Sequence, residues 1–127
     1  MYPKEDLIHY RMDRARETLE EANLMYKNGY LHGAANRLYY ACFYAVLALL
    51  ARHDLSSSKH SGVMGLFNRE FVKPGRIPLE MGKFYSRVFD ARSEGDYADL
   101  LSEAEIEETD LDMAKRFIQS IEELIQE

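Results

Sequence analysis

The stretch LYYACFYAVLALLA, residues 38–51, is the longest run in the chain without a charged residue. A helix needs roughly 18–20 apolar residues to cross a bilayer, so this run is too short to span a membrane. Because the run is apolar on nearly every side, a helix built from it must be covered from several directions. It therefore predicts a central buried helix, covered by its own chain or in part by another subunit.

The rest of the chain shows helical periodicity on both sides of this run. Apolar residues recur at steps of three and four, and no segment alternates with period two for long enough to form a strand. Asn28-Gly29 and Lys73-Pro74-Gly75 are typical of turns, and the capping-box pattern SEAE at 102–105 predicts a helix start. The predicted helices cover about 5–28, 31–52, 58–72, 78–94 and 102 onward. These elements predict an all-α fold, an up-and-down antiparallel bundle of four to five helices.

Composition limits the class of protein. With 127 residues, 46% of them hydrophobic, the chain is expected to form a single domain over 1–127. Cys42 is the only cysteine, which excludes an intrachain disulfide and a cysteine-based zinc site. The N-terminal sequence MYPKEDLIHYRMD carries charges where a secretory signal needs an apolar run. We therefore expect a cytoplasmic protein.

The net charge of −6 hides an uneven distribution. Residues 1–51 are balanced, residues 52–92 carry eight bases and four acids, and residues 93–127 carry two bases and twelve acids. The acidic total argues against a general nucleic-acid coat protein. The basic middle third still allows a specific RNA or nucleotide site.

Arg92 is the first candidate for function. It continues the apolar stripe Met81, Tyr85 and Val88 at helical spacing. A guanidinium cannot lose its proton, so on an apolar face it needs a carboxylate, carbonyl groups or an anionic ligand in a cleft. The alternative is structural: Arg92 would bond the carbonyl groups of the last helical turn, before Gly95 ends the helix.

Asn36 lies in a similar position on the central helix. It continues a stripe through Tyr40, which predicts that an amide and a tyrosine hydroxyl lie inside the bundle near its end. Arg92, Asp96 and Tyr97 are the partners that we expect for these polar groups, either in a ligand site or only to satisfy their hydrogen bonds.

The histidines show no spacing typical of a metal site; they are His9, His32, His53 and His60. The central helix offers no inward carboxylate, which excludes a di-iron bundle. We therefore expect no metal and no cofactor. His60 lies near the start of the helix predicted at 58–72, where a helix N-terminus disfavours the imidazolium, and a neutral surface histidine is the simplest interpretation.

Three segments together resemble a small stand-alone HEPN-domain protein, named for higher eukaryote and prokaryote nucleotide-binding. They are AANRLYYACFYAVLALL at 34–50, KHSGVMGLFNREFVKPG at 59–75 and FDARSEGDYADL at 89–100. The resemblance covers residues 5–126. It implies a bundle of four or five helices, usually a homodimer, often encoded beside a minimal nucleotidyltransferase as a toxin and antitoxin pair.

The resemblance also implies a reaction. Many HEPN proteins are metal-independent RNases with an Arg-x4-6-His motif that meets its symmetry mate across the dimer cleft. Arg92 matches the arginine of this motif, but Tyr97 stands five residues later and no histidine follows His60. Because a tyrosine with a pKa of about 10 is a poor base at neutral pH, the resemblance supports the fold more firmly than nuclease activity.

Three functional hypotheses follow. The first is a homodimeric binding module for a nucleotide, an RNA or a nucleotidyltransferase partner, with a cleft lined by Asn36, Tyr40, Arg92, Asp96 and Tyr97. The second is a structural dimer in which these polar groups only fix the packing. The third is an RNase in which Tyr97 or His60 replaces the missing histidine, which requires His60 to approach Arg92.

Overall fold

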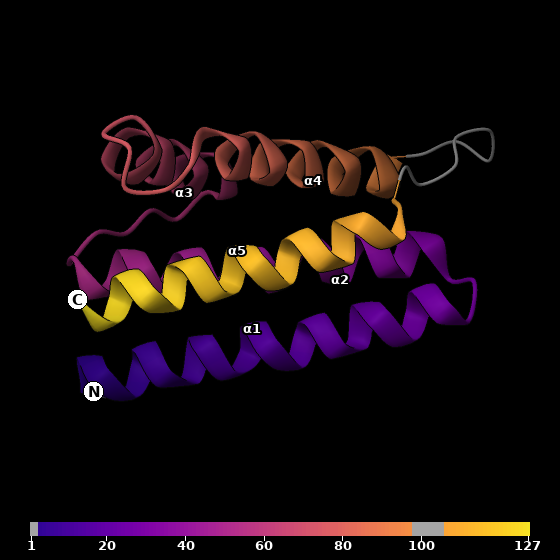
Figure 1. Cartoon of the computed structure of the whole chain (residues 1–127), viewed down its shortest axis with the longest axis horizontal. Coiled ribbons are helices and arrows are strands. Elements are labelled where there is room, and N and C mark those ends of the chain that lie inside the picture. The colour runs from indigo at the N-terminus through magenta and orange to yellow at the C-terminus, as the bar shows by residue number, and fades with distance from the viewer. Residues whose placement is uncertain (1–2, 98–105) are drawn as a thin grey trace.

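The structure, a computed structural model, describes residues 3–97 and 106–127, with only the backbone described for 93–97. Within these ranges the chain is helical and contains no strand. The elements are α1 (Lys4–Lys27), α2 (Leu31–Arg52), α3 (His60–Phe67), the π-helical turn η1 (Asn68–Val72), α4 (Leu79–Tyr97) and α5 (Glu108–Gln126). The long helices α1, α2, α4 and α5 run in alternating directions (Figure 1). The predicted all-α antiparallel bundle is confirmed.

Helix α2 lies at the centre of the bundle, as the apolar run predicts. It packs against α1, α3, α4 and α5. By length and composition alone its 22 residues could cross a membrane, but 61% of its most apolar window is buried inside the bundle. This burial is what a core helix requires, because each side of α2 is removed from water by a different neighbour.

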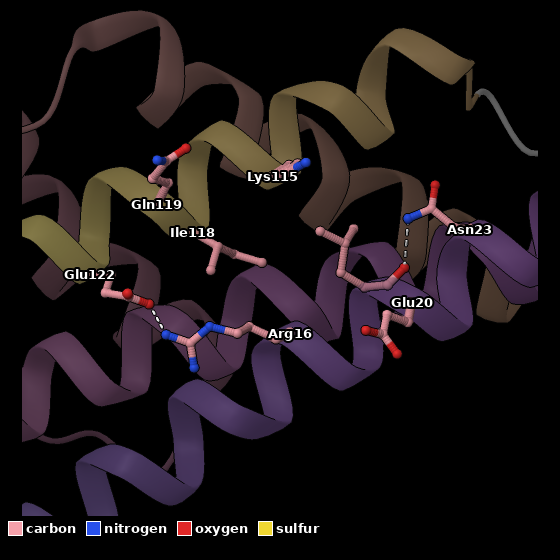
Figure 2. A pocket seen from close by; sticks show the side chains of 8 residues that line it. Arg16, Glu20, Asn23, Lys115, Ile118, Gln119 and Glu122 are labelled. Carbon is pink, nitrogen blue, oxygen red and sulfur yellow. Dashed lines mark hydrogen bonds and ion pairs between the residues drawn. The ribbon is translucent and has the colours of Figure 1, made fainter.

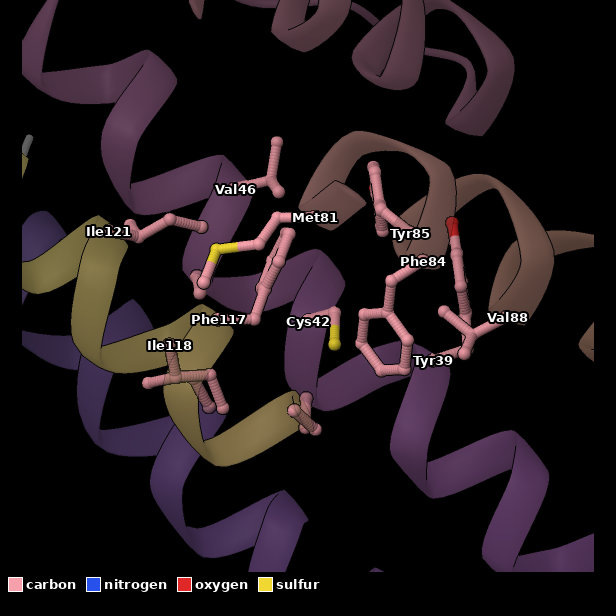
Figure 3. Close-up of a cluster of buried hydrophobic side chains, with 14 of the residues drawn as sticks. Tyr39, Cys42, Val46, Met81, Phe84, Tyr85, Val88, Phe117, Ile118 and Ile121 are labelled. Atoms are coloured by element: carbon pink, nitrogen blue, oxygen red, sulfur yellow. The ribbon is translucent and has the colours of Figure 1, made fainter. Parts of the chain in front are cut away.

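Aromatic side chains fill the space between α2 and its neighbours (Figure 3). Phe117 of α5 is fully buried and lies 5.7 Å from the ring centroids of both Phe67 and Tyr85, and 6.1 Å from that of Phe84. Phe67 belongs to α3, and the other two belong to α4. The side chain of Phe117 therefore packs α5 against both α3 and α4.

Two turns between helices agree with the sequence. α1 ends at Lys27, and Gly29 takes a positive φ of 81°, which glycine adopts without the steric cost of a Cβ. Gly75 does the same at φ 84° in the turn after η1. These two positions reverse the chain where the predictions placed the ends of helices.

Three helix boundaries differ from the predictions. The helix predicted at 58–72 begins at His60 and widens into η1, where the Lys73 N–H bonds the Asn68 carbonyl at 2.8 Å. α4 continues to Tyr97 rather than ending near 94, because a glycine inside a helix costs only about 1 kcal/mol relative to alanine.

The start of α5 is the third difference. The helix begins at Glu108, later than the predicted start at Ser102, which lies outside the described residues. Glu107 and Asp110 form a reciprocal capping box at this start. Asp110 also accepts a hydrogen bond from Nη2 of Arg87 at 2.6 Å. The capping box of Glu107 and Asp110 is therefore supported by a hydrogen bond from α4.

Replacing Phe117 with Ala should lower the free energy of unfolding by about 3–5 kcal/mol, because it leaves a cavity between α3, α4 and α5. Urea denaturation followed by far-UV circular dichroism measures this change. Tyr10→Ala is the control, since Tyr10 is 62% exposed and its loss should change stability by less than about 0.5 kcal/mol. Equal losses in both variants would contradict the central role of Phe117.

Candidate functional site

Tyr39 of α2 is the residue around which the candidate site is built. Its side chain is fully buried, and its hydroxyl forms a hydrogen bond with Nδ1 of His60 at 2.8 Å. The guanidinium carbon of Arg92 lies 5.0 Å from the centre of the same ring. Tyr39 thus brings the first residue of α3 and a residue of α4 to one place on α2.

Arg92 is held by aromatic rings. Its guanidinium carbon lies 5.8 Å from the ring centre of Tyr40 and 5.9 Å from that of Phe89, in addition to Tyr39. Such cation–π contacts stabilise a cation by about 0.5–2 kcal/mol each. Because α4 continues to Tyr97, Arg92 does not belong to the last helical turn. Its interpretation as a structural residue near the helix C-terminus stays a prediction.

A hollow of about 320 Å³ opens beside Arg92. Asn36, Arg37 and His32 line it from α2, and Ala91 and Arg92 line it from α4. This volume is at the lower end of the range of small-molecule sites. The structure therefore brings Arg92 and Asn36 to one hollow, with Tyr40 in contact with the arginine.

Asn36 has a partner that differs from those expected. Its Oδ1 accepts a hydrogen bond from Nη1 of Arg37 at 2.8 Å, and Nε of Arg37 donates to Oε1 of Glu21 at 3.0 Å. The amide is half-buried at the surface rather than enclosed in the bundle. Arg37, which the sequence reasoning did not consider, is thus a second cation at the hollow. The only sequence signal for it is its position directly after Asn36.

Asp96 and Tyr97 lie in the final turn of α4, and their side chains fall outside the described residues. Their contribution to the site stays a prediction. Tyr39 was not among the predicted site residues, although it stands directly before Tyr40. Its place in the apolar run at 38–51 predicts only that it is buried, and the tertiary contacts show that its hydroxyl bonds a histidine.

His60 does not behave as a free surface residue. Its ring stacks on Phe43 at a centroid distance of 4.3 Å and is half-buried. Burial, followed by the positive charge of Arg92, lowers the pKa of His60 below its usual value. The imidazole is therefore neutral at physiological pH, as expected, but the main causes are burial and Arg92.

The protonation of Tyr39 and His60 determines what the site can do chemically. Burial raises the pKa of Tyr39 to about 12, so its hydroxyl keeps its proton. A neutral imidazole has one nitrogen that accepts and one that donates. In the tautomer whose Nδ1–H donates to the Tyr39 oxygen, Nε2 is the nitrogen of His60 that can accept a proton, and the positive charge of Arg92 acts on the same ring.

Other polar features are less suited to chemistry. Cys42 is fully buried, and burial raises the pKa of its thiol well above the usual value, so a reactive thiolate is disfavoured. The described ranges contain no group of three histidine, cysteine or acidic residues that could hold a metal ion.

A larger hollow of about 490 Å³ lies between α1 and α5 (Figure 2). Arg16 of α1 and Glu122 of α5 form an ion pair across it. Asn23 on the same side donates a hydrogen bond to the Leu19 carbonyl at 3.0 Å. The ion pair therefore joins two helices, and the amide satisfies a carbonyl group of its own helix.

A helical bundle in which a buried tyrosine contacts a half-buried histidine and a half-buried arginine defines a helical protein with a candidate anion site. The model of the HEPN domain family matches residues 8–127. The chain belongs to the HEPN family, which confirms the resemblance found in the sequence.

Relatives at three levels of identity support this assignment. A Thermotoga maritima protein named "UPF0332 protein" is 50% identical over 128 residues, covering 100% of this chain and 97% of the relative. Two Methanocaldococcus jannaschii proteins are both named "Putative toxin". One is 31% identical over 68% of this chain and 58% of its own length, and the other is 30% identical over 94% and 90%.

Replacing Arg92 with Met should raise the pKa of His60, because it removes a positive charge that disfavours the imidazolium. Following the ring proton shifts of His60 by NMR during an acid titration measures this. Arg76→Gln is the matched control: burial and then the charge of Arg76 lower the pKa of His53, so this variant should move His53 and leave His60 unchanged. An unaltered His60 pKa in folded Arg92→Met would show that the two groups do not interact.

Proposed function

We propose that this chain is a toxin-type HEPN protein that binds single-stranded RNA at the hollow formed by Asn36 and Arg92, with Tyr40 beside it. The observation that carries the proposal is the position of Arg92, fixed by three aromatic rings at the wall of an open hollow. The names of the two M. jannaschii relatives support the toxin type.

The residues around the hollow match the parts of a nucleotide. A guanidinium presents donors in a fork that fits phosphate oxygens. The half-buried ring of Tyr40 offers a face for a base, and arginine next to tyrosine is a recurring combination in proteins that bind single strands. The basic region that contains Arg92 supplies the favourable field, since residues 52–92 carry four more bases than acids.

The family resemblance supplies the assembly that we propose. Two copies would form a homodimer with a shared cleft, and a minimal nucleotidyltransferase would be the protein partner of the pair. Phe43 and Leu47 of α2 are only partly buried in one chain, and a second copy would cover them. We propose the cytoplasm as the compartment, since a single buried cysteine fits a reducing environment.

Arg92→Ala should weaken RNA binding by about tenfold or more, because a charged hydrogen-bond donor to phosphate is lost. Fluorescence anisotropy of a labelled single-stranded RNA in EDTA measures the dissociation constant. Arg69→Ala is the control. Arg69 is exposed in η1, pairs with Glu70 and does not line this hollow. If Arg92→Ala keeps its fold and binds as the wild type does, the arginine is structural and the proposal fails.

A second candidate function is metal-independent RNA cleavage, and the placement of His60 favours it. The sequence lacks a histidine after Arg92, but the fold supplies one from α3 through Tyr39. Neutral His60, in the tautomer whose Nδ1–H donates to the Tyr39 oxygen, would take the 2′-hydroxyl proton at Nε2 while the 2′-oxygen forms a bond to phosphorus. The bond from phosphorus to the 5′-oxygen then breaks, and that oxygen takes a proton from solvent. Arg92 would stabilise the additional negative charge on the phosphate.

His60→Gln should slow any such cleavage by about a hundredfold, because glutamine cannot accept the proton. The measurement uses end-labelled RNA in EDTA, with His53→Gln as the control, since His53 contacts Phe71 away from Arg92. Cleavage by His60→Gln at the wild-type rate would remove His60 from the reaction. No cleavage by the wild type would leave RNA binding as the function.

A further inference from the structure

A second hollow of about 350 Å³ lies between α1 and α2, next to the hollow of Arg92. Asn36 and Arg37 line both, so the two hollows meet at these side chains. Arg14 and Thr18 line the second hollow from α1, and Tyr44 lines it from α2. None of these last three residues takes part in the site described above.

Thr18 is the unusual residue of this second hollow. Its side chain is only 1% exposed, yet its hydroxyl makes no hydrogen bond within the part of the chain that the structure describes. Buried hydroxyl groups in folded proteins nearly always have a partner, and threonine in a helix can bond the carbonyl one turn earlier. A buried donor that lines a polar hollow indicates a bound group outside the protein.

A continuous row of cations and rings connects the two hollows. The Arg92 guanidinium carbon lies 5.8 Å from the ring centre of Tyr40, the ring centres of Tyr40 and Tyr44 are 6.2 Å apart, and the Arg14 guanidinium carbon lies 5.3 Å from the ring centre of Tyr44. Tyr40 and Tyr44 are one helical step of four residues apart, about 6 Å along the axis of α2. The row therefore follows α2, with an arginine at each end.

Two cations line the second hollow, and each has one acidic partner. Arg14 pairs with Glu17 at 3.6 Å and Arg37 pairs with Glu21 at 3.0 Å, and of these two acids only Glu21 lines the hollow. Alternating arginines and half-buried rings are the surface on which proteins bind a single strand, with phosphates on the cations and bases on the rings. A free anion would use only the arginines and would leave the rings unused.

We propose that the hollow between α1 and α2 is a second nucleotide subsite, which takes the next part of the RNA strand bound at Arg92. A base packs against Tyr44, a phosphate pairs with Arg14, and the Thr18 hydroxyl donates to an oxygen of the same nucleotide. This inference rests on the proposed RNA binding. It adds the path of the strand over the surface, from α4 across α2 to α1.

The test compares two labelled RNAs, a dinucleotide and a hexanucleotide, by fluorescence anisotropy with the full chain in EDTA. The dinucleotide fills only the Arg92 hollow, whereas the hexanucleotide reaches both. Thr18→Val and Arg14→Gln should each weaken hexanucleotide binding by about fivefold to tenfold and leave dinucleotide binding unchanged. Arg92→Ala should weaken the binding of both RNAs. Arg69→Gln is the control for the loss of one positive charge, and it should have a smaller effect than Arg14→Gln.

The outcomes separate the two proposals. If Thr18→Val and Arg14→Gln bind the hexanucleotide as the wild type does, while Arg92→Ala loses binding, the second subsite is wrong and the proposed function stands. If the wild type binds neither RNA, the proposed function fails and the subsite fails with it. Circular dichroism and thermal unfolding confirm the fold of each variant. Valine matches threonine in shape, and Arg14→Gln decides the question if Thr18→Val does not fold.

Discussion

Helix α2 carries apolar side chains on nearly every side, and removing them from water requires a neighbour in each direction. This requirement places α1, α3, α4 and α5 around one axis. The small side chains of α2 allow close approach, while Tyr39 and the aromatic residues of α3, α4 and α5 fill the wider spaces. Residues far apart in the chain therefore meet at α2.

The same burial creates the chemistry of the site. A tyrosine hydroxyl in an apolar core needs a hydrogen-bond partner, and His60 supplies it. Burial keeps the Tyr39 hydroxyl protonated and, together with the charge of Arg92, keeps the His60 ring neutral. The packing of α3 and α4 against α2 thus determines both the positions and the protonation states of the polar groups.

Arg92 shows how a cation can be placed on an apolar stripe. The faces of Tyr39, Tyr40 and Phe89 hold the guanidinium electrostatically while the residue still lines an open hollow. The row of rings continues to Tyr44 and Arg14, so one surface combines positive charge with aromatic faces. Phosphate and base are the two chemical groups that such a surface suits together.

The sequence by itself determined the all-helical class, the extent of α1 and α2, the HEPN family and the position of Arg92 on an inner stripe. The helical class, the extents of the helices and the stripe depend on local periodicity and turn residues, whereas the family was identified by the resemblance of three segments. Only the tertiary structure decided the roles of Tyr39 and Arg37, the approach of His60 to Arg92, the end of α4 and the start of α5. Each of these depends on contacts between helices, and the spacing of residues along one helix carries no information about which neighbour it will meet.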